Sequence, residues 1–260
     1  MFESYLKPYK VNLNNLKRIG PINDGGYVIH KKSLELTEKI ITLGLNDDWE
    51  FEKHFIKLNK FVKVEAYDHT INKKFWIKRF KKDIIDFFLF KKLKLNKILD
   101  IFKYVDYCLF FKNHIHHLKK IGKSKRQIDL NKIFSKFTKN PSVFLKIDIE
   151  NSEYEVCNQV KNISSYINSL IIEFHDIDKL ENKKKIKKFI KENKKLKLIH
   201  IHGNNYAGCN RFGDPKCIEL TFVNTDCINV KEALTNLKYP LIKLDYPNLK
   251  RRPDISINFD

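Results

Sequence analysis

The sequence is poor in arginine, glycine and proline, and it has no long apolar run. Only 8 Gly and 7 Pro occur in 260 residues, while 42% of the residues are hydrophobic and 32% are charged, which excludes fibrous, low-complexity and disordered classes. No stretch of about 18 uncharged apolar residues is present, so we expect no membrane-spanning helix. The opening residues lack the apolar core of a secretory signal, and we therefore expect a soluble, cytoplasmic protein.

Cysteine is scarce and unpaired. The five cysteines are odd in number and lie far apart, and no C-x-x-C pair occurs among them. This spacing argues against a zinc knuckle or a redox motif, so we expect reduced thiols.

The charge is strongly one-sided. A formal net charge of +20 would ordinarily indicate nucleic acid or an anionic membrane as a partner, because lysine and arginine gather phosphates. The basic residues are 45 Lys and only 6 Arg, whereas sites that recognise phosphate or base edges favour the planar fork of arginine. We therefore expect a solvated lysine surface and no nucleic acid partner. A nucleic-acid methyltransferase or binding module remains the alternative.

Short runs of β-branched and aliphatic residues alternate with helical spacing. Five runs have the composition of buried parallel strands: 39–45, 61–68, 143–148, 170–175 and 197–202. Apolar residues recur at helical intervals after the third and fourth runs. Residues 218–224 and 254–259 are expected to add a closing strand and an edge strand. The pattern predicts an α/β protein of one domain, with a mostly parallel seven-stranded sheet and helices on both faces.

Residues 71–125 interrupt this order with a segment dense in lysine and aromatics, which we expect to be a helical insertion. It could be a basic amphipathic helix for a membrane or a partner, or a lid over the active site. Its many apolar positions, such as Ile84, Leu95 and Leu99, instead favour packing on the domain or a homodimer contact. His114, His116 and His117 are expected to be surface histidines rather than a metal cluster.

Polar residues end each predicted strand, where an open parallel sheet binds its ligands. The first run ends in a turn that contains Gly44, Asn46 and Asp47, and the second ends in Asp68. This spacing suits a glycine turn beneath a nucleoside, with an acid for the ribose hydroxyls. Because no G-x-G-x-x-G phosphate cradle is present, a mononucleoside-type cofactor is favoured over a dinucleotide.

Three later strands end in Asp148, His175 and His202, and we expect these side chains to converge. One carboxylate and two imidazoles are a known set of ligands for a divalent ion. The same residues could instead act unaided as a base and its orienting groups, and His202 could be only a hydrogen-bonded packing residue.

Segments across most of the chain resemble the FkbM family of S-adenosylmethionine-dependent methyltransferases. They are DGGYVI at 24–29, LGLNDDWEFE at 43–52, AYDHT at 66–70, FLKIDIENSEYEV at 144–156, IIEFHD at 171–176, HIHGNN at 200–205 and the closing YPNLKRRPDISINF at 246–259. The resemblance implies a Rossmann-like class I methyltransferase fold. It also implies O-methyl transfer from S-adenosylmethionine to small molecules or sugars, such as intermediates of surface polysaccharide biosynthesis.

The resemblance also implies roles for single residues. Gly44, Asn46 and Asp47 would line the methionine part of the cofactor, Asp68 would hold the ribose, and Asp148 would face the methyl group. One departure is Asn151, where the family commonly has glycine, although asparagine tolerates a left-handed backbone.

The acceptor hydroxyl must lose a proton, for which His202 or His175 could be the general base. Alternatively, Mn²⁺ or Mg²⁺ held by Asp148, His175 and His202 could lower the pKa of the acceptor. An anionic phosphate acceptor would need no base. A non-catalytic interaction protein on the same fold is the remaining alternative.

Overall fold

A seven-stranded mixed sheet forms the centre of the computed structural model, which describes residues 2–88, 102–122, 124, 127–138 and 140–259. Its strands lie in the order β5-β4-β3-β6-β7-β9-β8. The pairs among β5, β4, β3, β6 and β7 are parallel, and β9 runs antiparallel to both of its neighbours. The strands are β3 (Lys39–Leu43), β4 (Lys63–Tyr67), β5 (Ile115–His117), β6 (Val143–Ile147), β7 (Ile167–Phe174), β8 (Leu196–Gly203) and β9 (Ile218–Asn224). This order confirms the predicted Rossmann-like methyltransferase fold.

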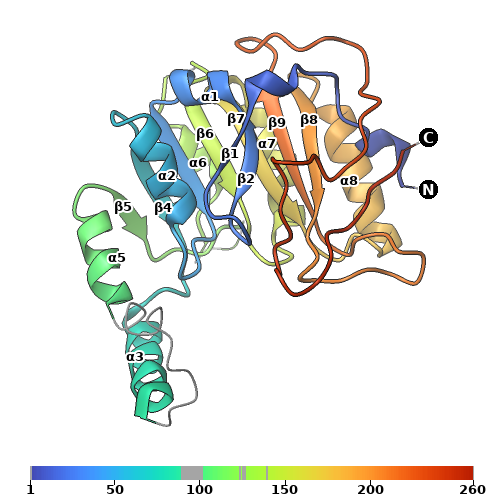
Figure 1. Ribbon diagram of the computed structural model, residues 1–260. Coiled ribbons are helices and arrows are strands. Elements are labelled where there is room, and N and C mark those ends of the chain that lie inside the picture. Colours follow the sequence, from blue (N-terminus) through green and yellow to red (C-terminus); the bar gives the residue numbers. More distant parts are fainter. Residues whose placement is uncertain (1, 89–101, 123, 125–126, 139, 260) are drawn as a thin grey trace.

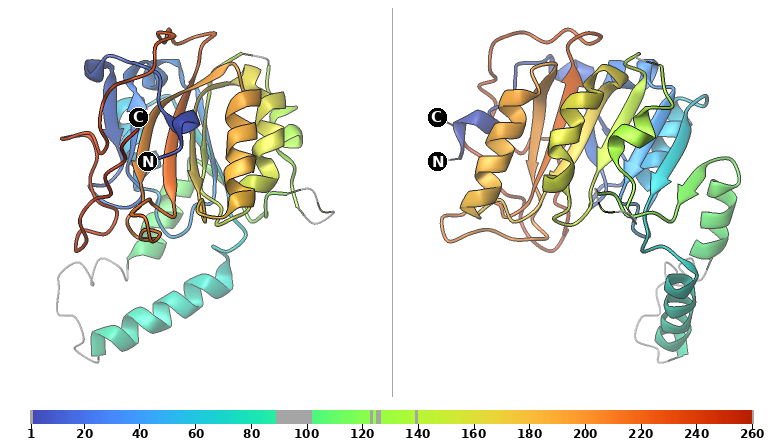
Figure 2. Two further views of the ribbon diagram at one scale, coloured as in Figure 1. Left: turned by 90° about the vertical axis from the view of Figure 1, so that its right-hand side faces the viewer. Right: turned by 180° about the vertical axis from the view of Figure 1, so that it is seen from behind.

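Helices cover both faces of this sheet, as predicted (Figures 1 and 2). One face carries α6 (Leu130–Phe134), α7 (Glu153–Ile163) and α8 (Leu180–Glu192). The other face carries α1 (Lys31–Leu36), α2 (Glu50–Leu58) and the antiparallel hairpin of β1 (Leu16–Ile19) and β2 (Tyr27–His30). The strands are buried on both sides, with every residue of β6, β7 and β9 buried. Continuous apolar strands of this kind are typical of a sheet covered on both faces.

Two parts of the strand prediction are wrong. Residues 254–259 form no strand in the sheet, since Ile257 makes only an isolated bridge with Tyr239. The seventh strand is β5, which pairs in parallel with β4 and lies inside the segment expected to be helical. A three-residue strand is too short to give an alternating pattern, so the sequence does not reveal it.

The described part of the insertion also contains two helices, α3 (Lys73–Phe88) and α5 (Lys103–Phe111). The predicted packing of Leu95 and Leu99 lies outside the described residues, and Ile84 is half-buried. The three predicted surface histidines are half-buried and hydrogen-bonded. His114 accepts from the amide of Val64, while His116 and His117 bond to Asp68 and Glu65.

All five cysteines are free thiols, as predicted. None of the helices in the described ranges is long and apolar enough to cross a membrane.

Candidate active site

The carboxyl ends of the parallel strands surround a cavity of about 380 Å³. A volume of this order suits a nucleoside-sized ligand. The lining residues come from the segments after β3, β4, β5 and β6: Gly44, Asn46, Tyr67, Asp68, His69, Thr70, Lys119, Lys120, Ile121, Asp148, Ile149, Glu150 and Ser152. Four of the predicted site residues, Gly44, Asn46, Asp68 and Asp148, are therefore found around one cavity.

The turn after β3 depends on glycine. Gly44 has φ +79°, and a Cβ at this position would overlap the backbone carbonyl of Asp148. Any other residue would therefore push the turn away from the end of β6. The close approach brings the wall made by Gly44 and Asn46 directly against Asp148, as a glycine turn beneath a ligand requires.

Asp68 holds that turn in place. One carboxylate oxygen accepts the amide hydrogens of Leu45 and Asn46 at 3.0 and 2.9 Å, and the other accepts from the amide and hydroxyl of Thr70. Burial raises the pKa of Asp68, but these hydrogen bonds outweigh it and the pKa is lowered. Asp68 is thus an ionised acid at the cavity. A ribose hydroxyl that binds it would donate to carboxylate oxygens that already accept hydrogen bonds from the protein.

Asp47 lies in a different environment from the one predicted. It does not line the cavity, and its carboxylate forms an ion pair with Arg79 of α3. Asp47 therefore joins the turn after β3 to the insertion. Sequence patterns do not predict this contact, because Arg79 is distant from Asp47 in the chain.

Asp148 and His175 come together as predicted. They follow β6 and β7, which are parallel neighbours, so their ends meet at one edge of the sheet. Ligand atoms of Asp148, Glu150 and His175 all lie within 4.8 Å of one another. Glu150 extends into solvent beside the cavity, with 83% of its side chain exposed.

His175 is held in place by two residues of α7. The buried carboxylate of Glu153 accepts from the backbone amide of His175 at 2.8 Å and contacts Nδ1 at 3.2 Å. The hydroxyl of Tyr154 donates to the carbonyl oxygen of His175. Burial lowers the pKa of His175, but the hydrogen bond to Glu153 and the charges of Glu173, Glu153 and Asp148 raise it to about 9. His175 is therefore an imidazolium at neutral pH.

Asp148 has the opposite character. Burial raises its pKa to about 6, and the charges of Lys146 and His175 only partly oppose that rise. The buried Lys146 is itself paired with Glu52 at 3.3 Å. Asp148 is thus a carboxylate that titrates just below neutral pH at the wall of the cavity.

His202 does not join Asp148 and His175. Its Nδ1 contacts Glu219 of β9 at 3.0 Å and its Nε2 contacts Asp254 of the C-terminal segment at 3.0 Å. The predicted grouping assumed that β8 lies next to β7, but β9 separates the two strands. Although burial opposes it, the pairing with Asp254 and Glu219 raises the pKa of His202 to about 10.

The predicted set of metal ligands also loses His202. Within the described ranges, the groups able to hold an ion are Asp148, Glu150 and His175, and Glu173, His175 and Cys217. The first group suits a divalent ion, because Nε2 of His175 faces the carboxylates while Nδ1 is oriented by Glu153. The second is less suitable, since burial raises the pKa of the Cys217 thiol and keeps it protonated.

Backbone strain gathers at the same edge of the sheet. Among the residues that the structure describes, five non-glycine residues have positive φ, and four of them closely follow strands of this edge: Asn46, Glu150, Asn151 and Asp176. Asn151 has φ 69°, which confirms that the turn with asparagine in place of glycine keeps its left-handed backbone. Strain of this kind persists where the surrounding structure enforces a functional geometry.

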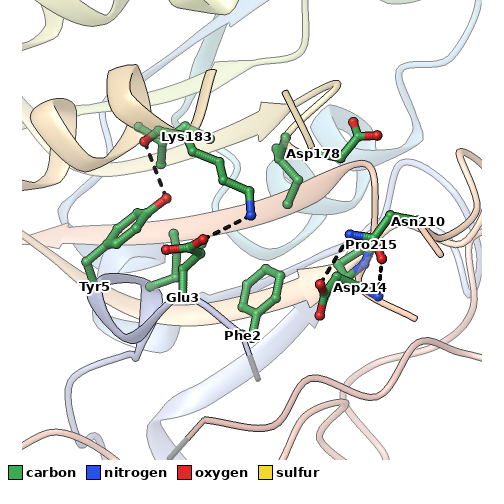
Figure 3. Close-up of a pocket in the computed structure, with 11 residues that line it drawn as sticks. Phe2, Glu3, Tyr5, Asp178, Lys183, Asn210, Asp214 and Pro215 are labelled. Atoms are coloured by element: carbon green, nitrogen blue, oxygen red, sulfur yellow. Dashed lines mark hydrogen bonds and ion pairs between the residues drawn. The ribbon is translucent and has the colours of Figure 1, made fainter. Parts of the chain in front are cut away.

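A second pocket shares no lining residue with this cavity (Figure 3). It is formed by the N-terminal segment, α8 and the β8–β9 connection, and its accessible volume is about 20 Å³. Lys183 is already paired there with Glu3 at 2.9 Å. The pocket is large enough for little more than one water molecule, so it is not a substrate site.

Residues 109–204 match the methyltransferase FkbM domain. No curated protein matches the chain. Similar solved structures include a putative rRNA methylase from Clostridium thermocellum (9% identity, 75% of this chain and 92% of that chain, TM-score 0.41). Others are the Methanococcus jannaschii fibrillarin pre-rRNA processing protein (11% identity, 80% and 70%, TM-score 0.39) and the O-methyltransferase from Bacillus cereus in complex with SAH (6% identity, 74% and 76%, TM-score 0.37). Residues 109–204 of this chain are therefore similar to the methyltransferase FkbM domain.

Proposed function

We propose that this protein transfers a methyl group from S-adenosylmethionine to a hydroxyl oxygen of a small molecule or sugar, such as an intermediate of surface polysaccharide biosynthesis. The observation that carries the proposal is the position of Asp148, a carboxylate in the wall of the cavity directly behind the Gly44 turn. A base at this position would meet an acceptor at the point where the cofactor's methyl group is presented.

The cavity suits the cofactor in size and in chemistry. Gly44 leaves room that a Cβ would fill, and Asn46 and Asp68 offer an amide and an ionised acid. We propose that Gly44 and Asn46 bind the methionine part and that Asp68 binds the ribose. The cofactor supplies a methyl group already activated as a sulfonium, so the chain must position the acceptor and remove its proton.

Asp148 is proposed as the general base. Because its pKa is about 6, it is mostly ionised at neutral pH and still basic enough to accept a proton from a hydroxyl as the new bond forms. A positioned base contributes roughly 100- to 10,000-fold to the rate. His175, expected from the sequence as a base, is proposed to orient Asp148 and balance its charge, because it already carries its proton at neutral pH.

The charge around the cavity favours a neutral acceptor. Asp148, Glu173, Glu219 and Asp24 all lie close enough to the buried Tyr27 to raise the pKa of its hydroxyl, after the larger effect of burial. Of these four acids only Asp148 lines the cavity, which is also lined by Asp68, Glu150, Lys119 and Lys120. A carboxylate beside the proposed position of the methyl group would stabilise a sulfonium and repel a phosphate. We therefore favour a hydroxyl of an uncharged sugar or small molecule over a phosphate oxygen or a nucleic acid.

A metal-assisted reaction is the second candidate, favoured by the proximity of Asp148, Glu150 and His175. A divalent ion held there would lower the pKa of the acceptor hydroxyl and take over part of the base's role. Activity that is lost in EDTA and restored by Mn²⁺ or Mg²⁺ would establish this mechanism. Unchanged turnover in EDTA would leave Asp148 acting without a metal.

The central test combines cofactor binding with methyl transfer. Calorimetry with S-adenosylmethionine should give binding heat with the wild type and with Asp148→Asn, whose side chain has nearly the same volume. Methyl transfer to a panel of neutral sugars should fall by at least about 100-fold in Asp148→Asn. Asp226→Asn is the matched control, because Asp226 pairs with Lys195 on the surface. No heat from the folded wild type would favour a non-catalytic protein, and full transfer by Asp148→Asn would remove Asp148 as the base.

A further inference from the structure

Helix α3 stands away from the sheet (Figures 1 and 2). It follows the end of β4 after a short loop, and so extends from the edge that carries the candidate active site. One face of its first three turns is tied to the body of the protein. Trp76 packs against Trp49 and Tyr107, and Arg79 pairs with Asp47 in the turn after β3.

A different face of α3 presents apolar side chains to solvent. Ile77, Phe80 and Ile84 recur at intervals of three and four residues, which sets them in one line along the helix. Ile77 is 48% exposed and Phe80 is 53% exposed. The neighbouring α5 adds exposed apolar residues, with Leu109 64% exposed. Exposed apolar residues that line up in this way mark a contact surface more often than isolated ones do.

Lysines flank this apolar line. Five exposed lysines lie in the first three turns of the helix: Lys73, Lys74, Lys78, Lys81 and Lys82. Across the described ranges of the chain, no ion pair involves any of them. The helix therefore combines an unpaired positive charge with an apolar line, which is the composition of helices that lie in a membrane interface.

We propose that α3 binds an anionic lipid surface, with Ile77, Phe80 and Ile84 inserted among the lipids and the flanking lysines on the headgroups. Charge decides against the other occupants. A second copy of a chain with net charge +20 would bring like-charged helices together, and a nucleic acid would leave the apolar line unused. Anionic lipid satisfies both the apolar residues and the lysines. This inference is independent of the proposed reaction.

The orientation of the bound protein follows from the attachment of α3. The inner face of the helix is paired with Asp47, in the same turn as Gly44 and Asn46 of the candidate active site. Binding through the outer face would thus hold the carboxyl edge of the sheet close to the lipid surface, without using any residue that lines the cavity.

Cosedimentation of the whole chain with vesicles tests the proposal. Vesicles of phosphatidylcholine with about one third phosphatidylglycerol should bind the protein, and pure phosphatidylcholine vesicles should bind it at least about tenfold less. The double variant Ile77→Ser and Phe80→Ser should lower binding to the anionic vesicles by about tenfold or more. Both side chains are largely exposed, so circular dichroism should show an unchanged fold.

Phe61→Ser is the matched control, because Phe61 is 92% exposed in the turn after α2. It should bind vesicles like the wild type. The proposal is overturned if the wild type does not cosediment with anionic vesicles at low salt, or if the double variant binds them as well as the wild type does. A molar mass twice that of the chain in light scattering, reduced to one chain by the double variant, would also overturn it and identify a second copy as the occupant.

Discussion

Gly44 lies against the backbone of Asp148 in the candidate active site. A comparison of Gly44 with Gly213 separates the effect of this contact from that of the backbone conformation. Gly44 and Gly213 both have positive φ, at +79° and +85°. A Cβ at Gly44 would overlap the carbonyl of Asp148, whereas a Cβ at Gly213 would meet nothing within 4 Å. The two positions thus share the backbone conformation and differ in the space around it.

Gly44→Ala should therefore abolish calorimetric binding of S-adenosylmethionine, because the turn must move away from Asp148. Gly213→Ala should bind the cofactor normally. In urea unfolding, both variants should lose about 1–2 kcal/mol for the left-handed conformation, and Gly44→Ala about 1–3 kcal/mol more for the overlap. Normal cofactor binding by Gly44→Ala would show that the turn is not part of the cofactor site.

The pKa of Asp148 gives a second prediction at the residue scale. A base must be ionised to accept a proton, so kcat/KM should fall as the pH drops below about 6, the raised pKa of Asp148. Above about pH 9 His175 loses its own proton, and the rate should change again. The residual activity of Asp148→Asn should show no step near pH 6. A step that persists in this variant would assign the titration to another group.

Single residues also show what the sequence could predict. Asp148 and His175 were found because each follows a strongly apolar run, and neighbouring parallel strands bring such ends together. Glu153 was missed, although it holds His175, because an acid in the first turn of a helix is an ordinary feature of sequence. Its importance arises from its burial next to the end of β7, which depends on tertiary packing.

Charged and amide groups bind the C-terminal segment to the end of β8. His202 of β8 contacts Glu219 and Asp254, and Asn205 donates to the carbonyls of Leu249 and Arg252. His202 is 2% exposed, so its charge and those of its partners are shielded from water. These contacts hold the segment against the end of β8.

His202→Gln should lower the free energy of unfolding by about 3–5 kcal/mol, because two carboxylates would lose their buried cation. His117→Gln is the control at an edge strand. Among the described residues Glu65 is its one ion-pair partner, and a third of its side chain is exposed, so the cost should be about 1 kcal/mol or less. Equal losses of unfolding free energy in the two variants would contradict a stabilising role for the buried contacts of His202.

The same contact should make stability depend on pH. Because the pKa of His202 is raised from its ordinary value near 6.5 to about 10, its contribution is complete below about pH 6.5. It should decline progressively as the pH rises toward 10. The decline should be smaller in His202→Gln, measured by urea unfolding at several pH values.

At the element scale, the sequence predicts the strands better than their order. Six of the seven strands of the sheet were expected from their apolar runs. Their order was not, since β9 enters between β7 and β8. An apolar run indicates that a strand is buried, but it does not indicate which strands are neighbours in the sheet. His202 was therefore wrongly grouped with His175. The strand β5 was missed because three residues are too few to show an alternating pattern of apolar and polar side chains.

The whole molecule combines a basic surface with an acidic edge. The net charge is +20, yet Asp68, Asp148 and Glu150 line the cavity, together with Lys119 and Lys120. Composition alone would suggest a polyanion as the substrate. The carboxylate of Asp148 at the proposed position of the methyl group disfavours an anionic acceptor, because the field at a site depends on the nearest groups.

Methyl transfer to nucleic acid should therefore be absent, although weak, salt-sensitive binding to the lysine surface is expected. A gel shift at low salt should show a diffuse complex that disappears at about 0.15 M salt. Incorporation of label from S-adenosylmethionine into the RNA or DNA should stay at background. Labelled nucleic acid at physiological salt would favour the nucleic-acid methyltransferase.

The most direct test of the account is a crystal structure of the whole chain with S-adenosylhomocysteine. We predict that its ribose lies against Asp68 and that its sulfur lies within about 7 Å of the Asp148 carboxylate, close enough for an acceptor oxygen to sit between them. A cofactor bound outside the cavity of Gly44 and Asp68, or a sulfur more than about 12 Å from Asp148, would contradict the proposed site.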